Sequence, residues 1–342
     1  MIRFLLRRLA TMLITLVAVS ALVFFIINLP PGNYLSNQIA EMQSTGEAAG
    51  VDKARALIER YSLDKPLWQQ YLVWIGAIPG PNGYDGLLQG NLGWSFELDR
   101  PVAEVVGETA GLTVIVNLAA LLFVYVVALP LGTIAAVRAN SWVDYIASLV
   151  GYIGLATPNF LLALIMLTYG ARYFDIPVGG LMAREYEGEP MTMDKIGSIL
   201  LHLIVPTVVI GTSAAAAVMR RLRANLMDEL NKPYVETARA KGVPPTQRIV
   251  RYPLRMALNP FIADIGNLAP QLVSGSVMIS VVMSLPTLGP ILLQSLKSQD
   301  IFMSGFILLF VSLLTLVGML ISDLLLAVLD PRIRLSSGRR SA

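Results

Sequence analysis

Six long runs of apolar residues dominate the pattern of hydrophobic and polar positions along this chain. A helix needs about 20 apolar residues to cross a hydrocarbon core of roughly 30 Å, and each run reaches that length. In order, the runs cover roughly residues 9–28, 110–137, 143–171, 199–219, 260–285 and 305–329. The pattern therefore predicts an all-α polytopic membrane protein with six transmembrane helices.

Composition supports this fold class. The 342 residues are 55% hydrophobic and only 14% charged, with a mean hydropathy of +0.64, which leaves too little polar surface for a single water-soluble globule. The sequence contains no cysteine, so it excludes disulfides, redox-active thiols and thiolate metal sites. The first run follows Arg3, Arg7 and Arg8, as in a signal peptide, but it is long and ends in Asn28-Leu-Pro-Pro-Gly32 without a small-residue cleavage site. We therefore interpret it as a retained helix.

The distribution of lysine and arginine predicts the orientation in the membrane, because positively charged loops stay in the cytoplasm. One side carries 17 of these residues, and nine of the 17 lie in residues 220–259, whereas the other side carries nine. Both termini, including the tail 330–342, are therefore predicted to be cytoplasmic. The net charge of +3 then reflects topology, and we expect no nucleic acid partner.

Residues 29–109, between the first two runs, are too many for a simple connection and predict an extracytoplasmic helical insertion. One amphipathic helix is predicted behind Asp52 as its cap, with a stripe formed by Ala54, Leu57, Ile58 and Tyr61. Pro66 opens a second, with a stripe formed by Trp68, Tyr71, Leu72 and Ile75. Because Trp74 lies beside that stripe, this helix either lies at the membrane interface or packs onto the preceding amphipathic helix.

The cytoplasmic segment 220–259 has a pattern of its own. Residues 234–241 predict a short helix in which Glu236 and Arg239 share one face, and Gly242 suits a left-handed C-terminal cap. Pro244 or Pro245 can start a second helix that runs toward the fifth membrane span through Arg248, Arg251 and Arg255. The pattern thus indicates a helix-turn-helix elbow, although on spacing alone a solvated basic loop that only maintains topology is the favoured interpretation.

Within this elbow, Glu236-Thr-Ala-Arg-Ala-Lys-Gly242 resembles the EAA signature of permease subunits of bacterial ABC importers. The chain as a whole resembles the DppB/OppB-type dipeptide, oligopeptide and nickel permeases over nearly its full length. Further matching motifs are Leu63-Asp-Lys-Pro-Leu-Trp-Gln-Gln-Tyr71, Gly90-Asn-Leu-Gly-Trp-Ser95, Leu285-Pro-Thr-Leu-Gly289 and Asp330-Pro-Arg-Ile-Arg334. The chain departs from the family pattern at Pro31-Gly-Asn-Tyr34, at Thr237 and at Tyr252-Pro-Leu-Arg-Met-Ala257, and the last departure affects the geometry after the elbow.

The resemblance implies a MetI-like permease core over residues 110–329, preceded by the cytoplasmic tip and first helix in 1–28, in a bacterial inner membrane. It implies that the first helix of the elbow is a coupling helix that docks on an ATPase. The residues implied for this contact are Tyr234, Glu236, Thr237, Ala238, Arg239, Ala240, Lys241 and Gly242. The partners implied are a homologous second permease subunit, two ATPase subunits, an extracytoplasmic solute-binding protein and membrane lipid. The solute is a peptide, or another solute of this family such as a nickel complex, glutathione or an opine.

The sequence itself has no G-x-x-x-x-G-K-[ST] phosphate-binding loop, so ATP and Mg²⁺ are expected on the partner subunits and no cofactor on this chain. We expect no catalytic and no metal-binding residues, since the only histidine is His202, and substrate-binding residues cannot be assigned. An ion-coupled secondary transporter or channel is the main alternative. A membrane scaffold and an intramembrane enzyme that uses Asp264 and Asp323 are weaker ones.

Polar and helix-breaking residues inside the spans have two interpretations each. Asp264 and Asp323 either line a substrate or ion pathway or, as we favour, have structural partners. The amides Asn117, Asn159, Asn267 and Gln271 can hydrogen-bond between helices. Five further residues either permit helix bends that are used in gating or only shape the packing of the helices: Pro158, Pro260, Gly266, Pro270 and Gly275.

Overall fold

The computed structural model describes residues 2–30, 34–45, 48–174, 177–186, 188–190 and 192–329. The motif at the chain's end, the tail 330–342, and most of the Pro31–Tyr34 motif therefore lie outside the described residues. The chain folds into two compact units. Among the described residues, unit 1 comprises 114–286 and 314–329, and unit 2 comprises Ile2–Thr113 and Thr287–Leu313.

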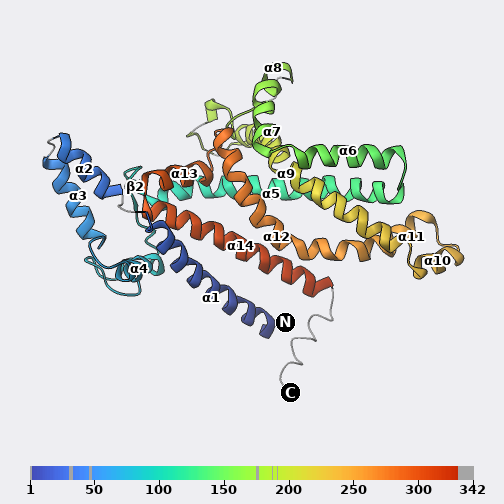
Figure 1. The fold of residues 1–342 in the computed structure, drawn as a ribbon, viewed down its shortest axis with the longest axis horizontal. Coiled ribbons are helices and arrows are strands. Elements are labelled where there is room, and N and C mark those ends of the chain that lie inside the picture. The colour runs from blue at the N-terminus through green and yellow to red at the C-terminus, as the bar shows by residue number, and fades with distance from the viewer. Residues whose placement is uncertain are drawn as a thin grey trace. The chain divides into compact units, whose positions relative to one another are not determined.

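Unit 2 contains the first apolar helix and the insertion, which the colour gradient of Figure 1 shows in blue and cyan. Its helices are α1 (Ile2–Ile27), α2 (Tyr34–Thr45), α3 (Ala48–Arg60), α4 (Leu67–Ile75), the 3₁₀ turn η1 (Leu87–Gln89), α13 (Leu288–Ser298) and the beginnings of α5 (Val102–Val137) and α14 (Ile301–Leu329). A two-stranded antiparallel sheet, β1 (Trp94–Ser95) and β2 (Arg100–Pro101), pairs Trp94 with Pro101. The all-α prediction did not include this hairpin.

The two predicted helices of the insertion are both present. α4 follows Pro66, as predicted, and ends at Gly76 in the left-handed conformation with φ 78°. α3 starts at Ala48, so Asp52 lies inside the helix and is not its cap. Alanine has the strongest intrinsic preference for helix, and Ala48 and Ala49 extend α3 upstream of the apolar stripe on which the prediction rested.

Aromatic side chains form the core of unit 2. Trp74 is 5% exposed and stacks near Phe24 of α1, with ring centroids 5.4 Å apart, and Tyr71 donates to or accepts from Ser20 at 2.8 Å. α4 therefore packs against α1, and its position at the membrane interface stays a prediction. Phe96 and Phe302 form an edge-to-face pair in the same core, with centroids 5.7 Å apart.

A buried carboxylate joins three segments of unit 2. Asp300, which is fully buried, accepts hydrogen bonds from the Ser95 hydroxyl at 2.6 Å and from the backbone N–H groups of Glu97 and Met303, both at 3.2 Å. Since Met303 lies in the first turn of α14, Asp300 also caps that helix. Burial raises the pKa of Asp300 above its ordinary value, although the hydrogen bonds oppose the shift.

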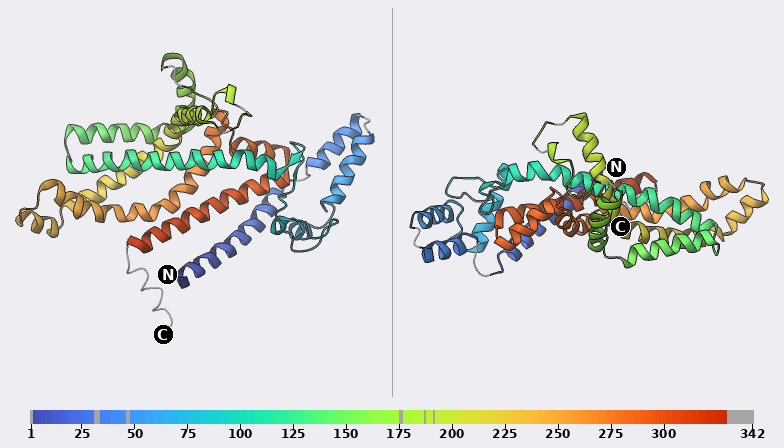
Figure 2. Two further views of the ribbon diagram at one scale, coloured as in Figure 1. Left: turned by 180° about the vertical axis from the view of Figure 1, so that it is seen from behind. Right: turned by 90° about the horizontal axis from the view of Figure 1, so that it is seen from above.

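Unit 1 is a group of long helices and their connections. It contains the rest of α5 and α14, α6 (Trp142–Ala156), α7 (Asn159–Ile165), the π-helical turn η2 (Met166–Gly170), α8 (Ala171–Phe174), the 3₁₀ turn η3 (Arg184–Tyr186), α9 (Met193–Leu230), α10 (Pro233–Ala240), α11 (Pro245–Arg251) and α12 (Pro253–Val282). Figures 1 and 2 show α6, α9 and α12 side by side, with α10 and α11 beyond the ends of α9 and α12. The core of this unit includes Val209, Leu222 and Leu226 of α9.

Four helices of the described chain are individually long and apolar enough to cross a membrane: Leu5–Ile27, Val102–Val137, Met193–Leu230 and Ile301–Leu326. Two further pairs qualify only if each bent pair is one span. These are Trp142–Ala156 with Asn159–Gly170, bent by 98°, and Pro245–Leu268 with Pro270–Val282, bent by 50°. Large apolar side chains on these helices stay exposed, such as Ile14 at 70% and Leu122 at 66%, which fits contact with lipid.

The run 143–171, predicted as one span, is therefore not one straight helix. α6 ends at Ala156, with Thr157 as its C-cap, and α7 begins after Pro158. Proline lacks the N–H for an intrahelical hydrogen bond, and it disfavours helical geometry at the residue before it, so the two helices change direction here. The interpretation of Pro158 as a bend is confirmed, whereas its use in gating stays a prediction.

Candidate functional site

The elbow predicted from the sequence is present as α10 and α11. Pro233 occupies the first turn of α10, where its missing N–H costs nothing, and Pro245 does the same for α11. Between them, Gly242 has φ +74°, and the N–H of Val243 donates to the carbonyl of Ala238 at 3.1 Å. This hydrogen bond closes the end of α10, as predicted for a left-handed glycine cap.

One face of α10 is buried and the rest is exposed. Val235 and Ala238 are 8% and 7% exposed, and α10 contacts α11. The exposed residues of the predicted set are Glu236, Thr237, Arg239, Ala240, Lys241 and Gly242, with Tyr234 partly exposed. Glu236 and Arg239 form no ion pair with any described residue, and both side chains are exposed.

Two hydroxyl groups of α10 form hydrogen bonds, one to α9 and one within α10 itself. The hydroxyl of Tyr234 donates to the Glu229 carboxylate at the end of α9. Partial burial, together with this hydrogen bond, raises the pKa of Tyr234 to about 12, so the phenol remains a donor at neutral pH. Thr237, which replaces the first alanine of the EAA pattern, donates to the carbonyl of Pro233 at 3.0 Å. Its hydroxyl is thereby satisfied within the helix.

The second helix of the elbow is shorter than predicted. α11 ends at Arg251, Tyr252 has φ −117° and ψ −80°, and α12 begins at Pro253. Arg255 therefore lies on α12, and the predicted continuous helix through Arg248, Arg251 and Arg255 is wrong. The physical reason is Pro253, which disfavours helical geometry at Tyr252, the residue before it. This break falls at the third departure from the family pattern.

Ion pairs join the helices on either side of the elbow. Arg223 of α9 forms a two-bond pair with Asp144 of α6, with N–O distances of 2.5 and 2.7 Å. Arg221 of α9 contacts Asp264 of α12 at 2.6 Å. The Tyr125 hydroxyl of α5 also donates to the carbonyl of Phe261 in α12 at 3.0 Å. α9 precedes the elbow and α12 follows it, so these contacts connect the two helices that flank the elbow with α5, with α6 and with each other.

Several other residues singled out from the sequence have structural partners. The favoured interpretation of Asp264 is confirmed by its contact with Arg221, and Asn267 donates to Asp264 at 3.2 Å. Gly266 permits close packing, because a Cβ there would lie 3.0 Å from the Met319 backbone. The ring Nδ1 of His202 lies 2.8 Å from the Ser198 carbonyl. In the described ranges no group of three His, Cys, Asp or Glu side chains could hold a metal ion.

The fold and this site define a multi-pass helical membrane protein with a charged elbow between two of its longest helices. Comparison with known families identifies residues 128–335 as a binding-protein-dependent transport system inner membrane component and residues 1–119 as the N-terminal part of such a component. The chain therefore belongs to the family of ABC importer permeases of the dipeptide and oligopeptide type, and it is a multi-pass protein of the inner membrane. Membership implies an ATPase partner and a binding protein.

Named relatives align along almost their whole length. The chain is 32% identical to the di/tripeptide transport system permease protein DppB of Pseudomonas aeruginosa, covering 98% of this chain and 99% of the relative. It is 30% identical to the oligopeptide transport system permease protein AppB of Bacillus subtilis, over 97% and 99% of the two chains. It is 28% identical to the dipeptide transport system permease protein DppB of Escherichia coli K12, over 98% and 99%.

Proposed function

We propose that this chain is the permease subunit of an ATP-driven importer of short peptides and that α10 is its coupling helix. The peptide class comes from the names of its relatives. The main support for the coupling role is that α10 exposes the charged side chains Glu236, Arg239 and Lys241, which form no ion pair with other described residues. It lies in the segment between α9 and α12, which form ion pairs with each other or with α6. ATP-driven closure of an ATPase dimer would displace α10, and α9 and α12 would convert this displacement into alternating access.

The surface of α10 suits a protein partner. Its apolar residues Val235 and Ala238 are buried against the rest of the chain. The exposed charged residues Glu236, Arg239 and Lys241 can therefore contact complementary charges on another subunit. A loop that served only as a topological signal would need its positive charge, but it would need neither a helix nor an exposed glutamate.

In this proposal the two bent pairs each count as one span, giving six spans with both termini in the cytoplasm. Residues 29–109 then lie outside the cytoplasm, where a solute-binding protein delivers its cargo. The complete importer contains a homologous second permease subunit and two ATPase subunits, and these bind the ATP and Mg²⁺.

The substitution Glu236→Arg tests the coupling role. With the importer reconstituted in liposomes, we expect ATP-dependent peptide uptake and the stimulation of ATPase activity to fall at least about tenfold, because reversing an interface charge places like charges together. Glu236 is exposed and forms no ion pair with another described residue, so the variant should insert and fold normally. Uptake of a radiolabelled tripeptide and phosphate release are the measurements.

Asp52→Arg is the matched control, because Asp52 is also an exposed acidic residue on a helix but lies far from the elbow in the sequence, on α3. It should leave both activities unchanged. Normal coupled turnover in Glu236→Arg would contradict the assignment of α10. Peptide uptake that continues without ATP hydrolysis would instead support the ion-coupled transporter.

A further inference from the structure

A groove between α6 and α9 of unit 1 has no role in the mechanism proposed so far. The two helices lie side by side (Figure 1), and the groove between them has a volume of about 510 Å³ and is open to its surroundings. Small-molecule sites typically enclose about 300–1,000 Å³. The groove is therefore large enough to hold the headgroup of a lipid.

The spacing of residues on the two helices forms the groove. α6 contributes Ser148, Tyr152 and Leu155, which lie three or four residues apart and so share one helix face. α9 contributes two alanines, Ala217 and Ala224, which are two turns apart, and three arginines. Because an alanine side chain ends at Cβ, these two positions leave open space beside the α6 face.

The three arginines give the groove its charge, and two of them have carboxylate partners. Arg221 contacts Asp264 at 2.6 Å, and Arg223 forms the two-bond pair with Asp144. Arg220 is exposed and forms no ion pair with any described residue. Three positive and two negative charges leave one positive charge, which is that of Arg220. The groove therefore favours an anion.

The guanidinium group of Arg220 is held in position by an aromatic ring. It lies 4.9 Å from the centre of the Tyr152 ring, at a distance where the cation is attracted to the ring face. A stacked guanidinium still presents its N–H groups in its own plane, where a phosphate can accept two of them. An anion that enters the groove thus meets a donor group that is already oriented.

The surface beside the groove is apolar. Leu149, Ile153 and Leu155 of α6 are all exposed, and Arg220 directly follows the apolar run 199–219. The end of an apolar run lies near the lipid headgroups, where the phosphates of the bilayer are found. A small soluble anion would leave these apolar side chains uncovered, whereas the acyl chains of a lipid would cover them.

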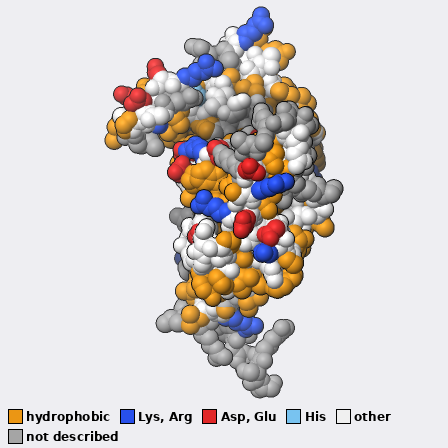
Figure 3. All heavy atoms as spheres, turned by 90° about the vertical axis from the view of Figure 1, so that its left-hand side faces the viewer, with side chains coloured by type: hydrophobic (Ala, Val, Ile, Leu, Met, Phe, Trp, Pro, Cys, Tyr) orange, Lys and Arg blue, Asp and Glu red, His pale blue; other side chains and the backbone are white. Residues whose placement is uncertain are grey.

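An arginine that directly follows an apolar run is also the ordinary signal that fixes topology. That role needs neither a stacked tyrosine nor a groove, and both are present here. On the face of the molecule drawn in Figure 3, acidic and basic side chains lie close to one another, so neither sign is in excess there. The groove differs from that face, because it combines an uncompensated cation with an apolar neighbour.

We propose that this groove binds one anionic phospholipid, with its phosphate at Arg220 and its acyl chains along the apolar face of α6. The lipid is one whose headgroup carries no compensating ammonium, such as phosphatidylglycerol. It would add a contact between α6 and α9 beside the Asp144–Arg223 pair. The assignment to the cytoplasmic leaflet rests on the proposed topology, whereas the preference for an anionic lipid rests on the groove itself.

The test uses the purified full-length chain in detergent micelles, to which dioleoyl phosphatidylglycerol or dioleoyl phosphatidylcholine is added. Native mass spectrometry counts the bound lipids and gives an apparent Kd for the first one. We expect phosphatidylglycerol to bind about fivefold more tightly than phosphatidylcholine, the value for one arginine near an anionic membrane surface. Arg220→Gln should weaken phosphatidylglycerol binding by the same factor and leave phosphatidylcholine binding unchanged. Because Arg220 is exposed and in no ion pair with a described residue, this variant should fold normally.

The chain offers a matched control for Arg220. Arg172 is also exposed and lies 5.7 Å from the centre of a tyrosine ring, that of Tyr173, but it does not line the groove. Arg172→Gln should therefore bind phosphatidylglycerol like the unmodified chain. Tyr152→Phe should also retain binding, since it keeps the ring face, whereas Tyr152→Leu should weaken phosphatidylglycerol binding about threefold.

Equal phosphatidylglycerol binding by Arg220→Gln and the unmodified chain, or an equal loss in Arg172→Gln, would overturn the proposal. So would full displacement of the lipid by glycerol 3-phosphate at about 10 mM, because a soluble phosphate would then suffice. If Arg220→Gln leaves lipid binding intact but prevents the ATPase or the second permease subunit from copurifying, the groove is a protein interface and the lipid assignment is wrong.

The outcome is independent of the proposed function. ATP-dependent peptide uptake that is lost in Glu236→Arg, together with no preference for phosphatidylglycerol, removes the lipid site and leaves the importer assignment intact. A lipid preference that depends on Arg220, in a chain that supports no ATP-dependent uptake, supports the site and removes the importer assignment.

Discussion

Replacing Asp144 with alanine is expected to lower the free energy of unfolding by about 1–3 kcal/mol, because it removes the buried acceptor of a charged pair with Arg223, whose side chain is 27% exposed. Asp144 is 1% exposed and accepts two hydrogen bonds from Arg223, one from the backbone N–H of Asn140 at 2.9 Å and one from the Ser148 hydroxyl at 3.4 Å. Denaturation of the purified chain in mixed micelles, followed by tryptophan fluorescence, measures the loss.

The control for this prediction is Asp228→Ala, which removes an exposed carboxylate from α9 and should change stability by no more than about 0.5 kcal/mol. The double variant Asp144→Ala/Arg223→Ala should be less destabilised than the sum of the single variants, because it leaves no uncompensated charge. Strict additivity, or a loss below about 1 kcal/mol in Asp144→Ala, would show that this pair does not hold α6 to α9.

Replacing Asp300 with alanine is expected to lower the free energy of unfolding by about 3 kcal/mol. Two effects oppose each other here. Removing a buried carboxylate recovers its desolvation cost, which is visible in its raised pKa. The substitution also leaves the Ser95 hydroxyl and the N–H groups of Glu97 and Met303 without their acceptor, and it removes the cap of α14. The loss of three hydrogen bonds at one buried position dominates.

The same denaturation assay tests this prediction. Asp300→Asn keeps one acceptor oxygen in an uncharged side chain, so it should lose less stability than Asp300→Ala. Glu104→Ala is the control, because Glu104 is 58% exposed and contacts Arg100 at 3.6 Å only at the surface. If Asp300→Ala is as stable as Glu104→Ala, the hydrogen bonds around Asp300 do not hold β1 to the start of α14.

The order of apolar runs and local turn signals predicted much of the secondary structure. Every apolar run lies in a long helix or in a bent pair, α4 begins after Pro66, and α10 ends before Gly242. These predictions succeeded because helix formation and capping depend on residues within one or two turns of each other. The family assignment from the EAA segment and its companion motifs is also confirmed. The docking role of α10, the six spans and the orientation of the termini stay predictions.

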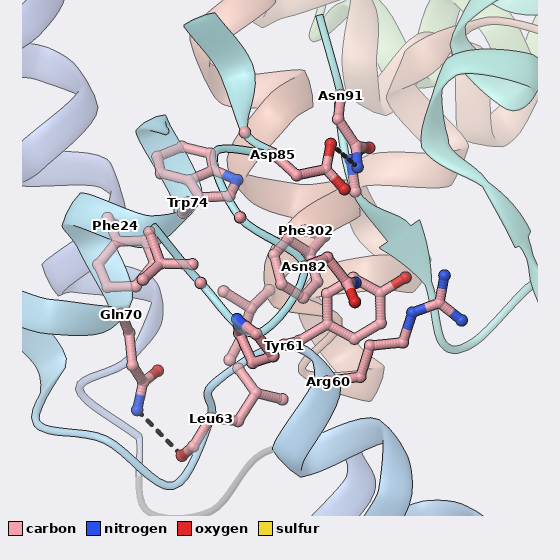
Figure 4. A pocket seen from close by; sticks show the side chains of 17 residues that line it. Phe24, Arg60, Tyr61, Leu63, Gln70, Trp74, Asn82, Asp85, Asn91 and Phe302 are labelled. Atoms are coloured by element: carbon pink, nitrogen blue, oxygen red, sulfur yellow. Dashed lines mark hydrogen bonds between the residues drawn. The ribbon is translucent and has the colours of Figure 1, made fainter. Parts of the chain in front are cut away.

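The sequence predictions failed in two situations: where nearby residues favour different helix boundaries, and where residues far apart in the sequence come together in the fold. Pro253 divides the helix that the basic residues 248–255 indicated, and Ala48 extends α3 past its predicted cap. A small hollow in unit 2, lined among others by Trp74 and Phe302 (Figure 4), was missed altogether. These two residues are far apart in the sequence, and the unpaired Nε1 of Trp74 is visible only once its surroundings among the described residues are known.

The sequence by itself determined that this is a helical membrane protein, which segments are apolar enough to span a bilayer, and where the first helix of its charged elbow lies. Only the tertiary structure shows which residues hydrogen-bond the buried carboxylates. Asp144 and Arg223 are 79 residues apart, and Ser95 and Asp300 are 205 apart, yet each pair is in direct contact. A carboxylate inside a membrane protein requires a hydrogen-bonding or charged partner. Its position in the sequence does not show which residue that partner is, because the packing of whole helices brings the two side chains together.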